Sequence, residues 1–274
     1  MNMDDDALFS LRDRVIVVTG GAGRLGSAFC KALVARNARV AVFDSLEPGK
    51  ARARFNGIGS NSRLRFEQVD VTDNASLQTA LDRVRANWGD PQGLVNAAAI
   101  DAPPDAPPEE NGPFETYPAS SWDRIMAVNV KGVMLSCQVI GAAMAKAGRG
   151  AIVNIASTYG VVSPDQSLYD YRRARGETFY KPVAYSASKS ALLNLTRYLA
   201  TYWGRKGVRV NTLTPGGVFA GQEKDFLDAY ERRVPMGRMA RENELDGAVV
   251  FLLSDASSYM TGANLVVDGG WTAW

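Results

Sequence analysis

The chain has 274 residues, of which 46% are apolar, so it can form one large α/β domain or two small ones around a sizeable core. Its 31 basic and 29 acidic side chains nearly cancel, which excludes the broad positive field of a nucleic-acid-binding protein. Histidine is absent, and this excludes serine–histidine triads, histidine general bases and most catalytic zinc sites. We therefore expect chemistry on a small molecule without a metal, with tyrosine, lysine, cysteine or a carboxylate moving the protons.

Short β-branched runs alternate with longer amphipathic stretches, which is the pattern of repeated strand–helix units. In chain order the predicted strands are residues 14–19, 39–43, 64–69, 93–96, 150–155, 208–213 and 265–267. The predicted helices are residues 27–36, 75–88, 122–147 and 184–204. This pattern predicts a single α/β domain over residues 1–274, with a doubly wound, mostly parallel seven-stranded sheet and helices on both faces.

Three segments depart from this rhythm. Residues 101–118 are rich in proline and acidic side chains, and residues 157–183 are irregular. Residues 216–234 are polar and mixed, which predicts a mobile flap. Because loops at the carboxyl edge of a parallel sheet carry binding residues, we expect these segments to border an active site.

The compartment is indicated by the cysteines and by the start of the chain. Cys30 and Cys137 lie in apolar stretches and offer no disulfide framework, as is typical of a reducing compartment. Residues 1–6 are acidic, whereas a signal peptide begins with basic residues. No apolar run approaches the roughly 20 residues that span a bilayer. We expect a cytoplasmic protein that binds neither a membrane nor a nucleic acid.

A glycine-rich turn follows the first strand. Its glycines, Gly20, Gly23 and Gly26 among them, stand between a strand and a helix, which is the context of a dinucleotide-binding turn in a Rossmann fold. Glycines let the backbone approach a pyrophosphate, and the free N–H groups of the helix amino terminus favour its negative charge. The alternative is an ordinary glycine-rich turn.

Asp44 ends the second strand, close to the roughly 20-residue separation from the turn at which an acid hydrogen-bonds the adenosine ribose. A carboxylate at this place repels a 2′-phosphate, so the sequence favours NAD over NADP. Arg24, inside the turn, could offset that repulsion, and NADP is therefore not excluded.

Tyr185 and Lys189 are four residues apart in a helical stretch, so their side chains share one helix face. A nearby ammonium lowers the pKa of a phenol, which allows tyrosine to exchange a proton with a substrate oxygen. Such a pair also arises by chance in a chain of this size. Ser157, just past a strand, could donate to the same oxygen, whereas Asn129 lies within a helix and could be an ordinary core amide.

These features occur together in one order that resembles the classical short-chain dehydrogenase/reductases over essentially the whole length. The elements that carry the resemblance are the run from Thr19 to Gly26, Asp44, Asp70-Val71, Asn96-Ala97-Ala98, Asn129, Ser157, Tyr185 with Lys189, Pro215-Gly216, residues 259–262 (YMTG) and residues 266–270 (VVDGG). The resemblance implies an oxidoreductase that transfers a hydride between a nicotinamide and a carbonyl or secondary alcohol.

The resemblance also implies residue roles. Asn129 would hold the lysine through a water, Ser157 would polarise the substrate oxygen, Tyr185 would be the acid/base, and Lys189 would also bind the nicotinamide ribose. The full set of expected cofactor-binding residues is Gly20, Gly23, Arg24, Leu25, Gly26, Asp44, Asp70, Val71, Asn96, Ala97, Ala98, Tyr185, Lys189, Pro215, Gly216 and Val218. A homotetramer is implied as well, with the helices at 122–147 and 184–204 paired across an interface.

Some positions depart from the family pattern. Arg24 stands where a glycine is common, Ala98 replaces the glycine of the usual Asn-Ala-Gly, and no threonine follows Pro215-Gly216 within the next few residues. These differences bear on how the cofactor is held more than on the type of reaction.

The distance from Ser157 to Tyr185 exceeds that usual in the family, so residues 168–182 are expected to be an insertion beside the active site, as are residues 101–118. The insertion is rich in cations and aromatic side chains that could bind a polar or anionic substrate, because guanidinium groups match carboxylate and phosphate oxygens. The candidates are Tyr159, Tyr169, Tyr171, Arg172, Arg173, Arg175, Tyr180 and Lys181. The alternative is a solvated loop or a subunit contact.

The insertion, the end of the chain and residues 183–203 resemble, more loosely, a subgroup linked to bacterial surface-sugar and flagellin modification, which suggests a sugar or sugar phosphate as substrate. Three alternatives remain: a reductase of 3-oxoacyl thioesters carried by acyl carrier protein, an epimerase or dehydratase of the related extended family, and a nucleotide-binding regulatory protein without turnover.

Overall fold

The computed structural model describes residues 7–101 and 107–274, so the expectation of an acidic, non-signal start at residues 1–6 lies outside the described residues, as does part of the proposed insertion at 101–118. All described strands join one sheet of seven parallel strands in the order β3-β2-β1-β4-β5-β6-β7. Their bounds are β1 Val15–Thr19, β2 Arg39–Asp44, β3 Leu64–Gln68, β4 Gly93–Asn96, β5 Gly150–Ile155, β6 Val208–Pro215 and β7 Asn264–Val267. The predicted Rossmann-type α/β sheet is confirmed.

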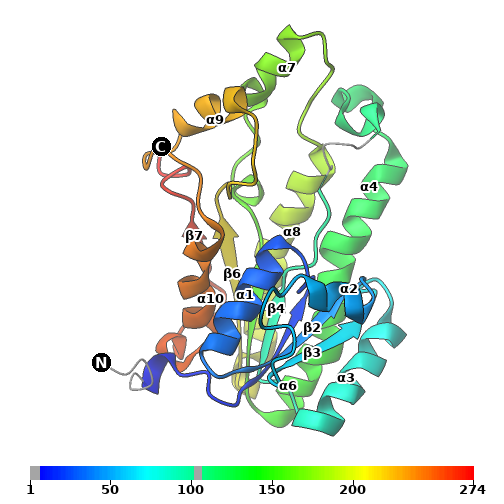
Figure 1. The fold of residues 1–274 in the computed structure, drawn as a ribbon, viewed down its shortest axis with the longest axis vertical. Helices are drawn as coiled ribbons and strands as arrows, with labels where there is room; N and C mark the ends of the chain where they lie inside the picture. Colours follow the sequence, from blue (N-terminus) through cyan, green and yellow to red (C-terminus); the bar gives the residue numbers. More distant parts are fainter. Residues whose placement is uncertain (1–6, 102–106) are drawn as a thin grey trace.

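Alternate side chains of β1 pack into two separate cores, because successive side chains of a strand point to opposite faces of the sheet. Ile16 and Val18 belong to the core that α1 (Arg24–Ala35) and α10 (Asp246–Leu253) cover. Val15 and Val17 belong to the core under α3 (Asn74–Trp88), the 119–147 helix and α8 (Val183–Trp203). Helices therefore lie on both faces of the sheet (Figure 1).

The 119–147 helix is continuous and contains two π-helical segments. It consists of α4 (Ala119–Met126), a π-helical segment Ala127–Lys131, α5 (Gly132–Ser136), a second π-helical segment Cys137–Gly141 and α6 (Ala142–Ala147). By length and composition alone it could cross a membrane, so the expectation that no segment reaches this limit was wrong for this helix. Half of the residues in its most apolar 18-residue stretch are buried. They pack against the sheet and α8, as the core helix of a globular protein does.

Four helices were not predicted. Residues 48–53 form α2 (Pro48–Ala53), and α10 follows the short turn at Glu242–Leu245. Residues 224–231 of the expected flap form α9 (Lys224–Glu231), and α7 (Asp170–Ala174) stands in the expected insertion. Both α7 and α9 lie at the top of Figure 1, beyond the carboxyl ends of the strands. Their segments meet there through a small aromatic core.

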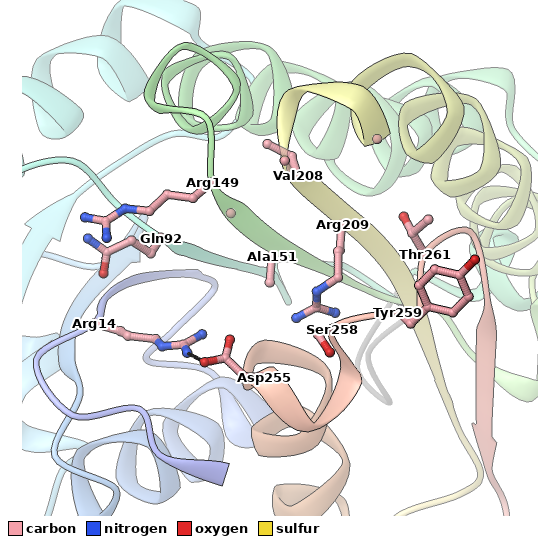
Figure 2. A pocket seen from close by; sticks show the side chains of 13 residues that line it. Arg14, Gln92, Arg149, Ala151, Val208, Arg209, Asp255, Ser258, Tyr259 and Thr261 are labelled. Carbon is pink, nitrogen blue, oxygen red and sulfur yellow. Dashed lines mark ion pairs between the residues drawn. The ribbon is translucent and has the colours of Figure 1, made fainter. Parts of the chain in front are cut away.

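At the opposite, amino edge of the sheet, arginines close the end of α10 (Figure 2). Arg209 donates to the carbonyls of Leu252 and Ser254, each at 3.0 Å, and Arg14 donates to the carbonyl of Leu253 and pairs with Asp255. The last carbonyls of a helix lack partners and carry partial negative charge. A cavity of about 730 Å³ lies beside these arginines. Because Arg14 and Arg209 are used to hold the end of α10, we interpret this cavity as structural. It lies at the opposite edge of the sheet from the predicted catalytic residues.

Replacing Arg209 should consequently destabilise the fold. We expect Arg209→Met to lower the free energy of unfolding by about 2 kcal/mol, because the carbonyls that it leaves are partly buried. Arg149→Met is the matched control, since Arg149 lines the same cavity but is exposed, and should change stability by less than about 0.5 kcal/mol. Urea unfolding measures both, and equal losses in the two variants would contradict this assignment.

Candidate active site and cofactor groove

Two neighbouring cavities lie at the carboxyl edge of the sheet. A groove of about 990 Å³ runs over the ends of β1, β2 and β4, and a cavity of about 480 Å³ lies at the ends of β5 and β6. Arg24, Leu25, Ala97 and Ala99 line both, so the two spaces adjoin. The carboxyl ends of strands at the reversal of strand order are where open α/β sheets bind ligands.

The glycine-rich turn is too tight for larger side chains. Gly20 has φ +62°, and a Cβ on it would lie 2.6 Å from Cα of Ala98. A Cβ on Gly26 would lie 2.1 Å from the Gly20 carbonyl oxygen. The turn leads into α1, whose N-cap residue, Gly23, has no side chain to accept from the first N–H groups of the helix. Free N–H groups therefore face the groove, which fits the pyrophosphate of a dinucleotide.

Asp44 holds this turn in place. Its carboxylate accepts from the Ala22 N–H at 2.9 Å and from the Leu46 N–H at 3.1 Å. Arg24, which sequence analysis expected to offset the charge of Asp44, is paired with Glu242 at 2.5 Å. Glu242 was missed because it lies far along the chain. Sequence analysis also did not name Lys31 and Arg54, two cations that line the same groove.

The structure brings most of the expected cofactor residues to these two spaces. Those that line the groove are Gly20, Gly23, Arg24, Leu25, Gly26, Asp44, Asp70, Val71, Ala97 and Ala98. Those that line the adjoining cavity are Pro215, Gly216, Val218, Tyr185 and Lys189. Such a continuous path from a phosphate turn to a tyrosine–lysine pair fits a nicotinamide dinucleotide.

Asn96 belongs to neither lining, because it is buried between strands. Its amide donates to Asn154 Oδ1 at 2.9 Å, and Asn154 donates to Thr196 Oγ1 at 2.8 Å. Thr212 donates to the same Thr196 oxygen. This polar ladder joins β4, β5 and β6 to α8 within the core, and so fixes the strand ends from which the catalytic cavity is built.

Ser157, Tyr185 and Lys189 meet in the smaller cavity. Ser157 follows β5 and is hydrogen-bonded to the Tyr185 hydroxyl. Lys189 is 4% exposed, its ammonium donates to the Ile155 carbonyl at 2.8 Å, and its Nζ lies 5.7 Å from the centre of the Tyr185 ring. One turn of α8 and the end of β5 thus converge on a single phenol.

The electrostatics differ from the sequence expectation. Burial raises the pKa of Tyr185, the charge of Asp101 raises it further, and the Ser157 hydrogen bond opposes both. Lys189 contacts the Ile155 carbonyl and the face of the Tyr185 ring, but it has lost its charge at the alkaline pH at which this buried phenol ionises. Burial lowers the pKa of Lys189 itself to about 8, with Asp101 acting in the opposite direction. The free protein therefore holds a neutral phenol.

Asn129 lies in the first π-helical segment, behind the tyrosine. Its amide exchanges two hydrogen bonds with the backbone of Ile100, at 2.8 and 2.9 Å, and donates to Ser188 Oγ at 3.0 Å. Ser188 in turn donates to the Tyr185 carbonyl. Asn129 therefore ties the chain after β4 to α8, in contact with the backbone of the tyrosine.

Of the expected substrate residues, the structure brings Tyr159, Tyr169 and Lys181 into the catalytic cavity but not the three arginines. Arg172 pairs with Glu177, Arg173 with Asp170, and Arg175 with Glu223 and Asp225. The partners of Arg175 are in the 216–234 segment, so this arginine joins two loops. The sequence shows that this segment is rich in arginine, but it does not show whether the arginines pair with nearby carboxylates or bind a ligand.

Asp101 and Tyr230 are described residues of the cavity lining that sequence analysis did not name, and they stand beside Tyr169 and Lys181, which it did. Tyr169 is hydrogen-bonded to Tyr159, and Asp101 forms an ion pair with Lys181. The Tyr230 hydroxyl accepts a hydrogen bond from the Gly217 N–H at 2.7 Å. Its ring stacks on that of Trp271, with the two ring centres 4.6 Å apart. The proline-rich and tyrosine-rich composition of the two loops was the available signal, but composition does not show which side chains turn inward.

Comparisons with known proteins agree with this geometry. A family described as enoyl-(acyl carrier protein) reductase matches residues 21–272. D-threitol dehydrogenase of Mycolicibacterium smegmatis is 37% identical over 270 residues, which cover 96% of this chain and 95% of that enzyme.

Two solved structures share the fold over almost their whole length. A short-chain dehydrogenase from Leptospira borgpetersenii with bound NAD⁺ has a TM-score of 0.84 and 30% identity, covering 99% of this chain and 96% of that one. A gluconate 5-dehydrogenase from Burkholderia cenocepacia in complex with NADP and tartrate has a TM-score of 0.84 and 26% identity, covering 98% of both chains.

The chain therefore belongs to the short-chain dehydrogenase/reductase family. It is an oxidoreductase that uses a nicotinamide cofactor and acts on the alcohol or carbonyl group of a small molecule. This confirms the predicted family and reaction class, and it removes the regulatory protein without turnover as an alternative. Because one solved relative holds NAD⁺ and the other NADP, membership of the family leaves the choice between them open.

Proposed function

We propose that this enzyme oxidises a secondary alcohol of a small uncharged polyol or sugar, with NAD as the hydride acceptor. The observation that carries the proposal is the meeting of Ser157, Tyr185 and Lys189 in a cavity that adjoins the dinucleotide groove. The similarity to D-threitol dehydrogenase supports a polyol. An anionic sugar phosphate is less well matched, because Arg172, Arg173 and Arg175 are paired outside the cavity.

In the proposed mechanism the Ser157 and Tyr185 hydroxyls hold the substrate oxygen. A nicotinamide held beside Pro215, Gly216 and Val218 would supply the acceptor for the hydride of the carbinol carbon. Tyr185, as phenolate, takes the hydroxyl proton, so the products are a carbonyl, reduced cofactor and a neutral phenol. Lys189, charged below pH about 8, stabilises that phenolate and binds the nicotinamide ribose. Asn129 positions the tyrosine through Ser188.

The choice of NAD rests on Asp44. Asp44 lines the groove beside the phosphate turn, and the arginine of the turn is neutralised by Glu242. A 2′-phosphate at this place would meet that carboxylate. We include in the proposal a homotetrameric, cytoplasmic enzyme in which residues 101–118, 168–182 and 216–234 are the substrate-binding segments. The exposed Tyr198 and Tyr202 on α8, 62% and 58% accessible, support a subunit contact along that helix.

A steady-state assay tests the proposal. The purified enzyme is mixed with NAD or NADP and a panel of tetritols, pentitols and hexitols, and the formation of reduced cofactor is followed by absorbance. We expect kcat/KM with NAD to exceed that with NADP by at least about tenfold. The rival activity is tested with a 3-oxoacyl thioester and reduced cofactor. Turnover of the thioester without turnover of any polyol would overturn the proposal in favour of that reductase.

A further inference from the structure

Two loop segments meet over the catalytic tyrosine through an ion pair. The carboxylate of Asp101, just after β4, contacts the ammonium of Lys181, just before α8. The Lys181 side chain is only 13% exposed, and that of Asp101 39%. Both line the catalytic cavity together with Tyr185, and neither is used by the proton transfer described above.

Lys181 is held firmly in this position. Its backbone N–H donates to Gln166 Oε1 at 2.9 Å, and its carbonyl accepts from Gln166 Nε2 at 3.3 Å. The ammonium Nζ lies 4.8 Å from the centre of the Tyr185 ring. The neighbouring Tyr180 N–H donates to the Asn111 carbonyl, which joins the two loops a second time. The ion pair therefore stands at a fixed place beside the reacting phenol.

The pair presents one acceptor and one donor to the cavity. A carboxylate only accepts hydrogen bonds and an ammonium only donates them, whereas a hydroxyl does both. A hydroxyl can therefore bridge the pair, donating to Asp101 and accepting from Lys181. A substrate carboxylate or phosphate cannot donate, and it would be repelled by Asp101 while Lys181 is already neutralised.

We propose that Asp101 and Lys181 form a hydroxyl-binding pair that recognises the carbinol group next to the one being oxidised, and so restricts the enzyme to uncharged vicinal diols. This inference rests on the proposed polyol oxidation. Asp101 is the one carboxylate among the described residues that line the catalytic cavity. Removing its charge should leave Lys181 as an unpaired cation, able to bind an acid.

The first part of the test compares substrates that differ only in the neighbouring groups. D-threitol has vicinal hydroxyls, 2-butanol has the same carbon skeleton without them, and threonate has a carboxylate at one end. For the wild-type enzyme we expect kcat/KM to be highest for D-threitol, lower for 2-butanol and lowest for threonate. The readout is the ratio of kcat/KM values, which a general loss of folded enzyme does not change.

The second part uses charge-removing variants of similar shape. Lys181→Met should lower the ratio of D-threitol to 2-butanol at least about tenfold, because a buried hydroxyl loses its donor. Asp101→Asn should raise the ratio of threonate to D-threitol at least about tenfold. Arg85→Met breaks the Arg85–Asp90 ion pair near the end of α3, outside the linings of both the groove and the catalytic cavity, and is the control. It should change neither ratio.

The outcomes separate the two proposals. If the wild-type enzyme oxidises polyols but Lys181→Met and Asp101→Asn change all substrates equally, the hydroxyl-binding pair is wrong and the proposed function stands. If the enzyme binds NAD but oxidises none of the polyols, the proposed function fails. Gain of threonate oxidation in Asp101→Asn, together with the loss of diol preference in Lys181→Met, supports both.

Discussion

Replacing Tyr185 by phenylalanine should lower kcat for alcohol oxidation by about 1,000-fold, which corresponds to about 4 kcal/mol. The change removes one oxygen from a ring that stays packed between α8 and the end of β5, and with it the group that exchanges the proton. Steady-state rates and NAD binding by calorimetry measure the effect, and kcat should fall far more than cofactor affinity. Tyr259→Phe, at a fully exposed tyrosine outside the lining of the catalytic cavity, is the control. A loss below about tenfold would contradict a proton-transfer role.

The pH profile of the wild-type enzyme tests the same assignment. Burial raises the pKa of the Tyr185 phenol, so the neutral acid needed for carbonyl reduction is present at neutral pH. Lys189 loses its charge as pH rises through about 8. Reduction should therefore be constant near neutrality and decline above pH about 8, while oxidation, which needs the phenolate, should be faster at alkaline than at neutral pH. A reduction rate that rises above pH 8 would sink this account.

The second large effect is expected at the phosphate turn. A Cβ on Gly26 would stand 2.1 Å from the Gly20 carbonyl oxygen and 2.8 Å from Cα of Gly21, closer than folded proteins permit. Gly26→Ala should consequently displace the turn and the start of α1, and weaken NAD binding at least about 100-fold, or about 2.7 kcal/mol. Isothermal titration calorimetry gives the dissociation constant.

Gly247→Ala provides the comparison, because a Cβ on Gly247 in α10 meets open space. This variant should bind NAD as the wild type does and unfold at an equal or higher temperature. Binding by Gly26→Ala within about threefold of wild type would show that the turn can rearrange without cost, and would weaken the dinucleotide interpretation of the groove.

Most of the sheet could be predicted because buried parallel strands are short, β-branched runs with few alternatives. The helix α10 escaped prediction for the opposite reason. Its sequence from Asp246 to Leu253 is almost uniformly apolar, and such a run has no helical period to detect. In the expected flap, α9 is amphipathic, but its apolar face packs on Tyr169 and Trp271, whose positions are set by distant parts of the chain.

The candidate site divides in the same way. Tyr185 and Lys189 share a helix face, so four residues of spacing were enough to place them together. The pairing of Arg24 with Glu242 and of Asp101 with Lys181 joins residues far apart in sequence, and no local pattern encodes it. The expected lowering of the Tyr185 pKa likewise required knowing where the lysine ammonium points, which depends on the Ile155 carbonyl.

The buried ladder from Asn96 through Asn154 and Thr196 to Thr212 has an evolutionary consequence. The ladder holds the strand ends that carry the catalytic residues from inside the core. The residues proposed to select the substrate instead lie on loops, which ion pairs such as Arg175–Glu223 join to one another. Mutations in those loops can exchange one substrate for another while the machinery of hydride and proton transfer is inherited unaltered. Such an architecture allows relatives with the same fold to act on different substrates.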